Sequence, residues 1–314
     1  MSVFDQHIAE RFAAYNVDTV EFTAEMPSDC IDLSVYSPPF ANLYIYSESE
    51  RDMGNVGSDG EFQASYKHLL RELWRVTKPG RLTAIHVKDL VYYSNASEDG
   101  SRGLRDFTGD CIRSHVEAGR EAAALAGVEG GWSFHTRITI WRCPVREMQK
   151  SKPDGLLYKN FRTDAARNRV GMPEYLLVFR KWAPGMDETA PIVHAPSDFP
   201  LDIWQEWASP VWMHTNMTDV LNVKVARDED AERHLCPMPL DLTDRAVRLW
   251  SNPGDTVYSP FMGIGSEGWA AMRAGRKFIG TELHPAYYKQ AVKNLAEMQT
   301  QSSGVDLLSM AGAA

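Results

Sequence analysis

The spacing of apolar residues predicts a strand, a helix and a second strand in the first third of the chain. Residues 30–36 form a short apolar run that Pro38 and Pro39 end, because consecutive prolines cannot continue a central strand. Residues 61–76 carry apolar side chains on one face of a helix, and residues 82–87 form a second apolar run. A helix between two strands predicts a parallel sheet covered by helices, which is an α/β fold.

The later parts of the chain continue this alternation. Strand patterns occur at 134–143 and 174–181. The remaining elements are expected as a helix at 240–250, a strand at 255–258, a glycine-rich turn and helix at 263–273, a strand at 278–281 and a helix at 285–298.

Residues 183–232 interrupt the order. This segment has five prolines from Pro184 to Pro210, several tryptophans and no long period. Such a composition predicts an irregular inserted module rather than a core element. The chain is therefore expected to divide into three parts, 1–182, 183–232 and 233–314.

The net charge of −9 disfavours a polyanionic partner, but the distribution of charge changes this picture. From Arg137 to Lys181, eleven basic residues stand against four acidic ones, so that 11 − 4 leaves a local charge of +7. Such a segment can hold a polyanion on one face, and the alternative is a solvated loop with scattered charges. The basic residues are Arg137, Arg142, Arg146, Lys150, Lys152, Lys159, Arg162, Arg167, Arg169, Arg180 and Lys181.

The composition indicates a protein of the reducing cytoplasm. No apolar run has the length of a membrane-spanning helix, and the N-terminus lacks the pattern of a signal peptide. The four cysteines are widely spaced and form no C-x-x-C pair, which argues against a zinc cluster and a disulfide framework. We therefore expect no metal and no membrane partner, and we interpret Cys143 and Cys236 as small buried residues.

A glycine-rich turn lies near the C-terminus. Gly263, Gly265 and Gly268 form a G-x-G-x-x-G pattern between an expected strand and an expected helix. Glycines let the backbone approach a ligand closely, and the helix N-terminus presents free amides. Glu282 ends the next strand, where a carboxylate can accept hydrogen bonds from ribose hydroxyls. The pattern predicts a nucleoside cofactor.

The position of this turn argues against NAD. A dinucleotide-binding fold places the turn first and several strands after it. Here the chain ends 46 residues after Gly268, which is enough for one strand and its helix. The remaining strands must come from the N-terminal half, so the sheet is expected to be circularly permuted relative to a dehydrogenase.

The sequence Ser37-Pro38-Pro39-Phe40 resembles the catalytic tetrapeptide of amino-group DNA methyltransferases, which is Asp, Asn or Ser followed by Pro-Pro and an aromatic residue. The resemblance covers roughly residues 17–90 and 130–295, and the order of catalytic turn before cofactor turn is that of the β group. It implies a doubly wound, mostly parallel and permuted sheet of the S-adenosylmethionine-dependent methyltransferase type. It also names the three parts as a catalytic half, a target-recognition module and a cofactor-binding half.

The resemblance implies S-adenosylmethionine as the cofactor. One residue departs from the family pattern, because Ser259 stands where an aspartate is usual. This change could weaken the hydrogen bonds behind the cofactor turn, although Asp255 and Glu282 remain. The residues expected at the cofactor are Asp18, His234, Pro237, Phe261, Gly263, Gly265, Ser266 and Glu282.

The resemblance also implies roles for the proline turn. An exocyclic amino nitrogen is a poor nucleophile because its lone pair is delocalised into the base. The Ser37 side chain and the Pro38 carbonyl would accept its two hydrogens, and Phe40 would stack on the base. Since a base inside a duplex cannot reach such a site, base flipping is expected. Serine at position 37 resembles the cytosine-N4 branch, but adenine N6 remains nearly equal.

The expected partners are double-stranded DNA and a second copy of the chain. Residues 144–171 and 183–232 are expected to read the target sequence. Three alternatives stay open: an RNA or protein amide methyltransferase, a catalytically inactive DNA-binding protein with this fold, and an NAD oxidoreductase. The residues expected to contact DNA are Arg146, Lys150, Lys152, Arg162, Arg167 and Arg169.

Overall fold

The computed structural model describes residues 3–39, 59–92, 100–150, 158–166, 170–185, 189–221 and 237–311. Within these ranges one large sheet contains β1 (Asp5–Ile8), β2 (Phe12–Asn16), β3 (Ile31–Tyr36), β4 (Thr77–Val87), β7 (Gly131–Ile140), β8 (Glu174–Trp182), β9 (Val211–Trp212), β10 (Thr256–Ser259) and β11 (Lys277–Glu282). A separate small hairpin is formed by β5 (Leu90–Tyr92) and β6 (Gly103–Arg105).

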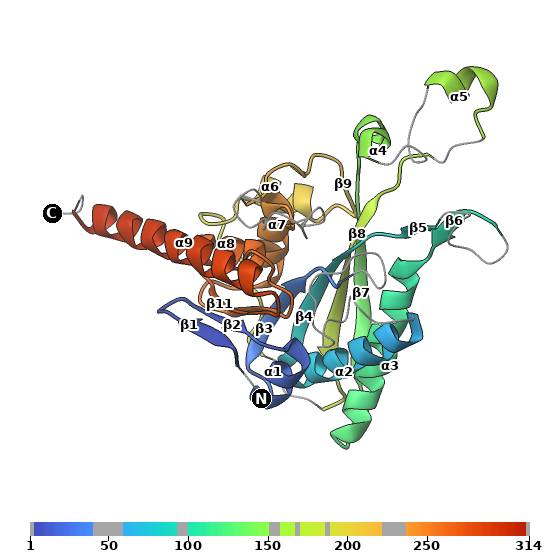
Figure 1. Cartoon of the computed structure of the whole chain (residues 1–314). Helices are drawn as coiled ribbons and strands as arrows, with labels where there is room; N and C mark the ends of the chain where they lie inside the picture. The colour runs from blue at the N-terminus through green and yellow to red at the C-terminus, as the bar shows by residue number, and fades with distance from the viewer. Residues whose placement is uncertain are drawn as a thin grey trace.

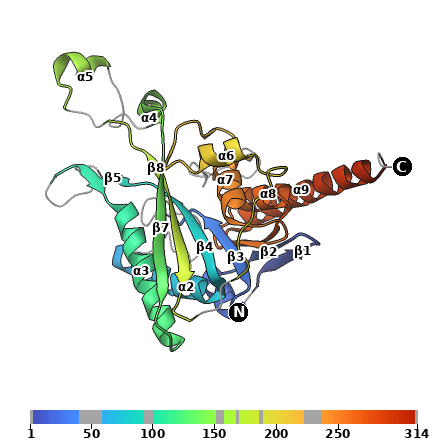
Figure 2. The ribbon, with the colours of Figure 1, turned by 180° about the vertical axis from the view of Figure 1, so that it is seen from behind.

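Helices lie on both faces of the large sheet (Figure 1, Figure 2). They are α1 (Thr19–Glu25), α2 (Asp59–Val76), α3 (Phe107–Leu125), α4 (Pro144–Lys150), α5 (Tyr158–Thr163), α6 (Leu201–Trp207), α7 (Leu240–Trp250), α8 (Ser266–Arg273) and α9 (Pro285–Ala311). Helices α1, α2 and α3 share one buried apolar cluster, and α7, α8 and α9 share a second. The expected α/β architecture is therefore present, with a core on each side of the sheet.

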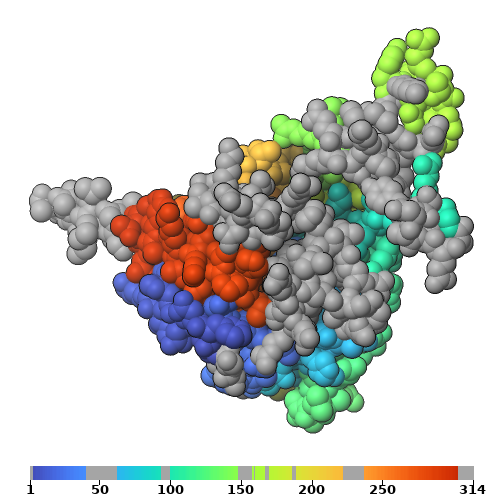
Figure 3. All heavy atoms as spheres, viewed as in Figure 1, coloured from blue at the N-terminus to red at the C-terminus, as the bar shows by residue number. Residues whose placement is uncertain are grey.

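The two ends of the chain meet inside this sheet. The strand order is β1-β2-β11-β10-β3-β4-β8-β7-β9, so the C-terminal strands β10 and β11 lie between the N-terminal strands β2 and β3. Strand β10 pairs in parallel with β3, with Val257 opposite Leu33 and Tyr258 opposite Ser34. In the space-filling view the C-terminal helix lies against the N-terminal strands (Figure 3). The circular permutation expected from the order of the turns is the observed arrangement.

Helix α3 was not predicted from the sequence. Its buried face consists largely of small residues, among them Ala118, Gly119 and Ala122, which give a weak hydrophobic signal. The small size has a reason, because a Cβ on Gly119 would lie 2.2 Å from the backbone nitrogen of Trp132 on β7. The helix approaches the sheet too closely for larger side chains, and close packing replaces apolar bulk.

The described part of the expected inserted module contacts the core through a few residues. Strand β9 extends the large sheet by pairing with β7, with Thr139 opposite Val211. Phe199 and Trp212 are 4% and 1% exposed, and both lie in the same apolar cluster as α7 and α8. Helix α6 has no buried residue, so the expected division of the chain stays a prediction. The role of this part in target recognition also stays a prediction.

A group of ion pairs holds β3, β4 and β10 together at the amino ends of the parallel strands. Asp32 accepts a hydrogen bond from the Thr256 backbone nitrogen at 2.9 Å, and its other oxygen lies 2.8 Å from Lys78 Nζ. Arg81 pairs with Asp255 at 3.2 Å. The expectation that Asp255 supports the cofactor turn was wrong, because Asp255 precedes β10 whereas the turn follows it at the opposite edge.

A search of the described helices for a membrane-spanning segment finds none with the required length and hydropathy.

Candidate active site at the carboxyl edge of the sheet

Two turns leave neighbouring strands at the same edge of the sheet. Ser37, Pro38 and Pro39 follow β3, and the segment 260–265 follows β10. Because β3 and β10 are parallel neighbours, the two turns begin about 5 Å apart in the direction of strand pairing. The rings of Tyr36 and Phe261 are in contact, with centroids 5.8 Å apart. The structure thus brings the two turns expected to be catalytic and cofactor-binding together, while Phe40 lies outside the described residues.

Three buried polar side chains, Tyr36, Tyr66 and His115, contact one another next to the proline turn. The Tyr36 hydroxyl lies 3.1 Å from the Tyr66 hydroxyl and 3.4 Å from His115 Nε2. Burial lowers the pKa of His115 to about 3, so the ring is neutral. Since its Nδ1 donates to the Cys111 carbonyl at 2.8 Å, Nε2 accepts from Tyr36. This interaction fixes the last residue of β3 immediately before Ser37.

Ser37 has a defined orientation. Its hydroxyl donates to the His86 backbone carbonyl on β4 at 2.9 Å, and the residue is only partly buried. A hydroxyl that donates its own proton keeps two lone pairs for accepting hydrogen bonds. Pro38 is buried beside it and has no N–H group to compete. The turn therefore presents hydrogen-bond acceptors, which suits a substrate that carries N–H donors.

Glu282 holds the cofactor turn in shape. Its two carboxylate oxygens accept hydrogen bonds from the backbone nitrogens of Gly263 at 3.0 Å and His284 at 2.8 Å. Gly263 and Gly265 have φ angles of +52° and +92°, which L side chains rarely adopt. A Cβ on Gly263 would meet no atom within 4 Å among the described residues, so the space above this glycine is open. Glu282 thus shapes the turn, and its expected contact with ribose hydroxyls stays a prediction.

The hydroxyls at both ends of the cofactor turn lack partners. Ser259 and Ser266 are 0% and 2% exposed, and neither Oγ has a hydrogen-bond partner among the described residues. Gly265 caps α8 without a side-chain bond, and among the first amides of that helix, that of Glu267 bonds to its own carboxyl group. Orphaned hydroxyls, the N-terminus of a helix and the open face of Gly263 fit a ligand with a carboxylate and a nucleoside. S-adenosylmethionine has both groups.

The other residues expected at the cofactor are placed less directly. Asp18 caps α1, because its Oδ1 accepts from the backbone nitrogens of Val20 and Glu21 at 2.9 and 3.0 Å. Its neighbour Asn16 donates to the carbonyl of Glu282 at 2.7 Å, so the start of α1 lies beside the end of β11. Pro237 precedes α7 and is half-buried, whereas His234 lies outside the described residues. The cofactor role of Asp18 stays a prediction, and its observed role is that of a helix cap.

Sequence reasoning missed Glu267, although it lies inside the glycine pattern. This residue of α8 is 4% exposed. Burial raises its pKa to about 8 from the ordinary value of 4.5; a hydrogen bond from its own backbone nitrogen opposes the rise, and the nearby charge of Glu282 adds to it. The available signal was the position of Glu267 between Gly265 and Gly268, where the helix was expected to pack closely on a strand.

The basic segment projects from the carboxyl edge as the connection between β7 and β8 (Figure 1). Arg146 and Arg162 are exposed on α4 and α5, as DNA contacts require. The side chain of Lys150 and residues Lys152, Arg167 and Arg169 lie outside the described part.

The local charge of +7 overstates the exposed charge of this segment. Arg142 pairs internally with Glu147 and Glu174. Lys181 is 2% exposed and pairs with Asp29 at 2.7 Å near the opposite edge. Cys143 was expected to be buried and is instead partly exposed. Backbone N–H groups of Arg146 and Val145 at the start of α4 lower the pKa of Cys143. Among the described residues no group of three His, Cys, Asp or Glu could hold a metal ion.

Glu267 gives a prediction for the pH dependence of stability. Because its pKa is raised in the folded chain, the unfolded chain loses this proton first as the pH rises. Relative to Glu267→Gln, the wild type should lose about 1.4 kcal/mol of unfolding free energy per pH unit between 4.5 and about 8. Urea unfolding of both proteins at pH 5 and pH 8 measures the difference. Parallel stability curves for the two proteins would contradict the buried, neutral carboxyl.

Comparison with known proteins identifies the family. The DNA methylase family pattern matches residues 31–293. The type II methyltransferase M.BglI of Bacillus subtilis is 35% identical over 88% of this chain and 84% of its own. The orphan methyltransferase M.BamHII of Bacillus amyloliquefaciens is 39% identical over 82% of this chain and 86% of its own. Two other curated DNA methyltransferases, one of them the adenine methyltransferase YhdJ of Escherichia coli, match over only 22% and 27% of their length.

A solved structure supports the same assignment of the fold. The PvuII DNA methyltransferase, described as cytosine-N4-specific, superposes with a TM-score of 0.61 at 16% identity and covers 93% of this chain and 90% of that one. The expected fold class is confirmed. The DNA modification methylase TTHA0409 of Thermus thermophilus, which superposes with a TM-score of 0.61 at 21% identity over 92% of this chain and 96% of that one, is described as complexed with S-adenosylmethionine, the cofactor expected here. The chain belongs to the DNA methylase family.

Proposed function

We propose that this chain transfers a methyl group from S-adenosylmethionine to the exocyclic amino group of a flipped base in double-stranded DNA, with cytosine N4 as the preferred target and adenine N6 as the alternative. The observation that carries the proposal is the orientation of Ser37. Its proton is committed to the His86 carbonyl, so its lone pairs face away from that bond, on a turn beside the cofactor turn.

The Ser37 hydroxyl and the Pro38 carbonyl then act as the two acceptors for the amino hydrogens of the base. Hydrogen bonds to these acceptors draw the nitrogen toward tetrahedral geometry and localise its lone pair. The rigid prolines and the buried Tyr36 keep the acceptors in place before the base arrives, so that little reorganisation is needed during reaction. Phe40 supplies a stacking surface for the base.

When bound, S-adenosylmethionine would supply an electrophilic methyl group on a sulfonium: the carbon–sulfur bond breaks as the nitrogen–carbon bond forms, S-adenosylhomocysteine leaves, and the amino group loses one proton to solvent. The residues that would hold the cofactor belong to the turn after β10 and to the end of β11. Glu282 orders the turn and would lie beside the ribose, while Ser259, Ser266 and the N-terminus of α8 would bind the polar groups of the cofactor.

The exposed arginines of the basic segment would bind phosphates, and the arrangement at the sheet edge requires the target base to leave the duplex. Serine at position 37 supports cytosine, because it resembles the cytosine-N4 branch. The mechanism needs one chain for each methyl transfer, so the expected homodimer is not part of it.

The target base and the role of Ser37 are tested together by mass spectrometry of nucleosides from treated duplex DNA. Wild type should yield N4-methylcytosine, and N6-methyladenine would select the alternative base. Ser37→Ala should lower methylation by about 100-fold or more, because the amino group then has one acceptor instead of two, while affinity for S-adenosylmethionine is kept. Ser34→Ala, which changes a buried serine of β3, the strand that Ser37 follows, should leave methylation intact. Methyl transfer to RNA alone, or full activity of Ser37→Ala, would overturn the proposal.

Neutralising Arg146 and Arg162 together should weaken DNA binding. For each arginine that binds a phosphate in the wild type, its neutralisation should reduce the slope of log affinity against log salt by roughly 0.9. Fluorescence anisotropy of a labelled duplex over a range of salt concentrations measures this slope. Arg273→Ala at the far end of α8 is the control and should keep it. If the double variant keeps the wild-type slope, the basic segment is not the DNA-binding surface.

A further inference from the structure

A second buried group of charges lies at the carboxyl edge, close to the proline turn. Glu174, the first residue of β8, accepts from His86 Nε2 at 2.9 Å and lies 3.3 Å from Arg142 Nε. Glu147 of α4 lies 3.0 Å from Arg142 Nη2 and 3.1 Å from Lys88 Nζ. We refer to His86, Lys88, Arg142, Glu147 and Glu174 as the edge network. It joins β4, β8, the end of β7 and the first helix of the basic segment.

The edge network is directly connected to the proposed catalytic serine. His86 contributes its side chain to Glu174 and its backbone carbonyl to the Ser37 hydroxyl. One residue of β4 therefore contacts both the catalytic turn and the network. Glu174 is thus linked to Ser37 through His86. One hydrogen bond joins Glu174 to the His86 side chain, and a second joins the His86 carbonyl to the Ser37 hydroxyl.

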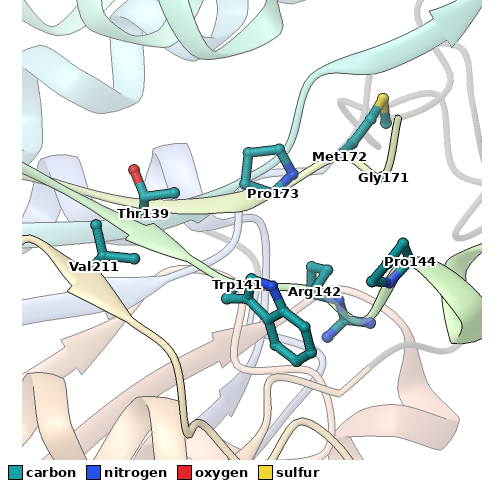
Figure 4. Close-up of a pocket in the computed structure, with 8 residues that line it drawn as sticks. All are labelled: Thr139, Trp141, Arg142, Pro144, Gly171, Met172, Pro173 and Val211. Carbon is teal, nitrogen blue, oxygen red and sulfur yellow. The ribbon is translucent and has the colours of Figure 1, made fainter. Parts of the chain in front are cut away.

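Apolar packing covers only part of the base of the basic segment. Its two legs leave the sheet at Trp141–Pro144 and Gly171–Pro173, and a cavity of about 280 Å³ lies along them (Figure 4). The legs touch where Gly171 lies against Pro144, and Met172 is buried, but Trp141 is 44% exposed. The ion pair of Arg142 with Glu174 therefore adds a polar link between the first leg and the start of β8.

The two carboxylates and Arg142 are largely shielded from solvent, whereas Lys88 is 28% exposed. The side chains of Glu147 and Glu174 are 6% and 12% exposed, and that of Arg142 is 12% exposed. Burial acts to raise the pKa of Glu174, but the hydrogen bond from His86 and the charges of His86, Arg142 and Lys88 outweigh it and lower the pKa to about 2. Buried ion pairs add little net stability compared with apolar residues, and their best-attested use is to specify one arrangement.

We propose that Glu174 and Glu147 are positioning residues, which hold the basic segment in one orientation relative to Ser37 so that DNA bound on the segment delivers its target base to the proline turn. This inference rests on the proposed function. It assigns the two carboxylates no contact with the substrate. Their effect is exerted through Arg142 and His86.

The role predicts a specific kinetic defect. In Glu174→Gln the exposed arginines of the segment remain, so DNA affinity and its salt slope should stay near the wild-type values. The orientation is no longer fixed, so kcat at saturating DNA should fall about tenfold to a hundredfold. The KM for S-adenosylmethionine should change little, because the cofactor turn lies on β10 and β11. Glu147→Gln, which breaks the link on the other side of Arg142, should give the same split.

A matched control comes from the opposite edge of the sheet. Asp32 is also a buried carboxylate that joins two cations and two strands, but it lies near the amino ends of β3 and β10. Asp32→Asn should lower stability without lowering kcat per folded molecule. Thermal unfolding and cofactor titration give the folded fraction of each variant.

Unchanged kcat in Glu174→Gln and Glu147→Gln would overturn the inference. So would a fall in kcat that accompanies an equal loss of cofactor affinity, or an equal fall in Asp32→Asn, because either result indicates a structural role only. If the wild type itself methylates no DNA, the proposed function fails, and this outcome is distinct from a failure of the edge network.

Discussion

The pairing of β3 with β10 is the constraint on which the active site depends. These strands come from opposite ends of the chain, and their parallel alignment places the proline turn and the glycine turn at one edge. At the amino ends of the two strands Asp32 accepts a hydrogen bond from Thr256, and at their carboxyl ends the rings of Tyr36 and Phe261 are in contact. Each half of the chain supplies half of a site, so neither turn has a function before the sheet is complete.

Much of this arrangement could be predicted because its signals are local. The strand before Ser37, the amphipathic helix after it and the glycine turn before α8 each have a period or a composition that identifies them. The expected sharing of the sheet between the two halves is observed in the pairing of β3 with β10. The family comparisons confirm the fold, whereas the glycine pattern alone predicted only a nucleoside cofactor and the resemblance specified S-adenosylmethionine.

The parts that were missed depend on tertiary contacts. Helix α3 packs through small residues against β7, so its apolar period is weak. Trp212 looked like part of an irregular insertion, yet it is 1% exposed in the main core. Charge counting treated Arg142 and Lys181 as free cations. In the structure Arg142 pairs with Glu147 and Glu174, and Lys181 pairs with Asp29. A sequence gives the number of charges, but their partners are set by the fold.

Because the fold sets the partners of polar groups, the two edges of the sheet differ in what they offer to ligands. Both carry buried ion pairs, but the amino edge uses them to close the sheet, while the carboxyl edge leaves hydroxyls, helix amides and serine lone pairs available to ligands. A crystal structure with S-adenosylmethionine bound would measure how close the methyl donor comes to the proline turn. We expect the methyl carbon within about 5 Å of Ser37 Oγ, a spacing that leaves room for a reacting nitrogen. A methyl group held on the opposite side of the sheet, or out of reach of Ser37, would contradict a shared site for the two turns.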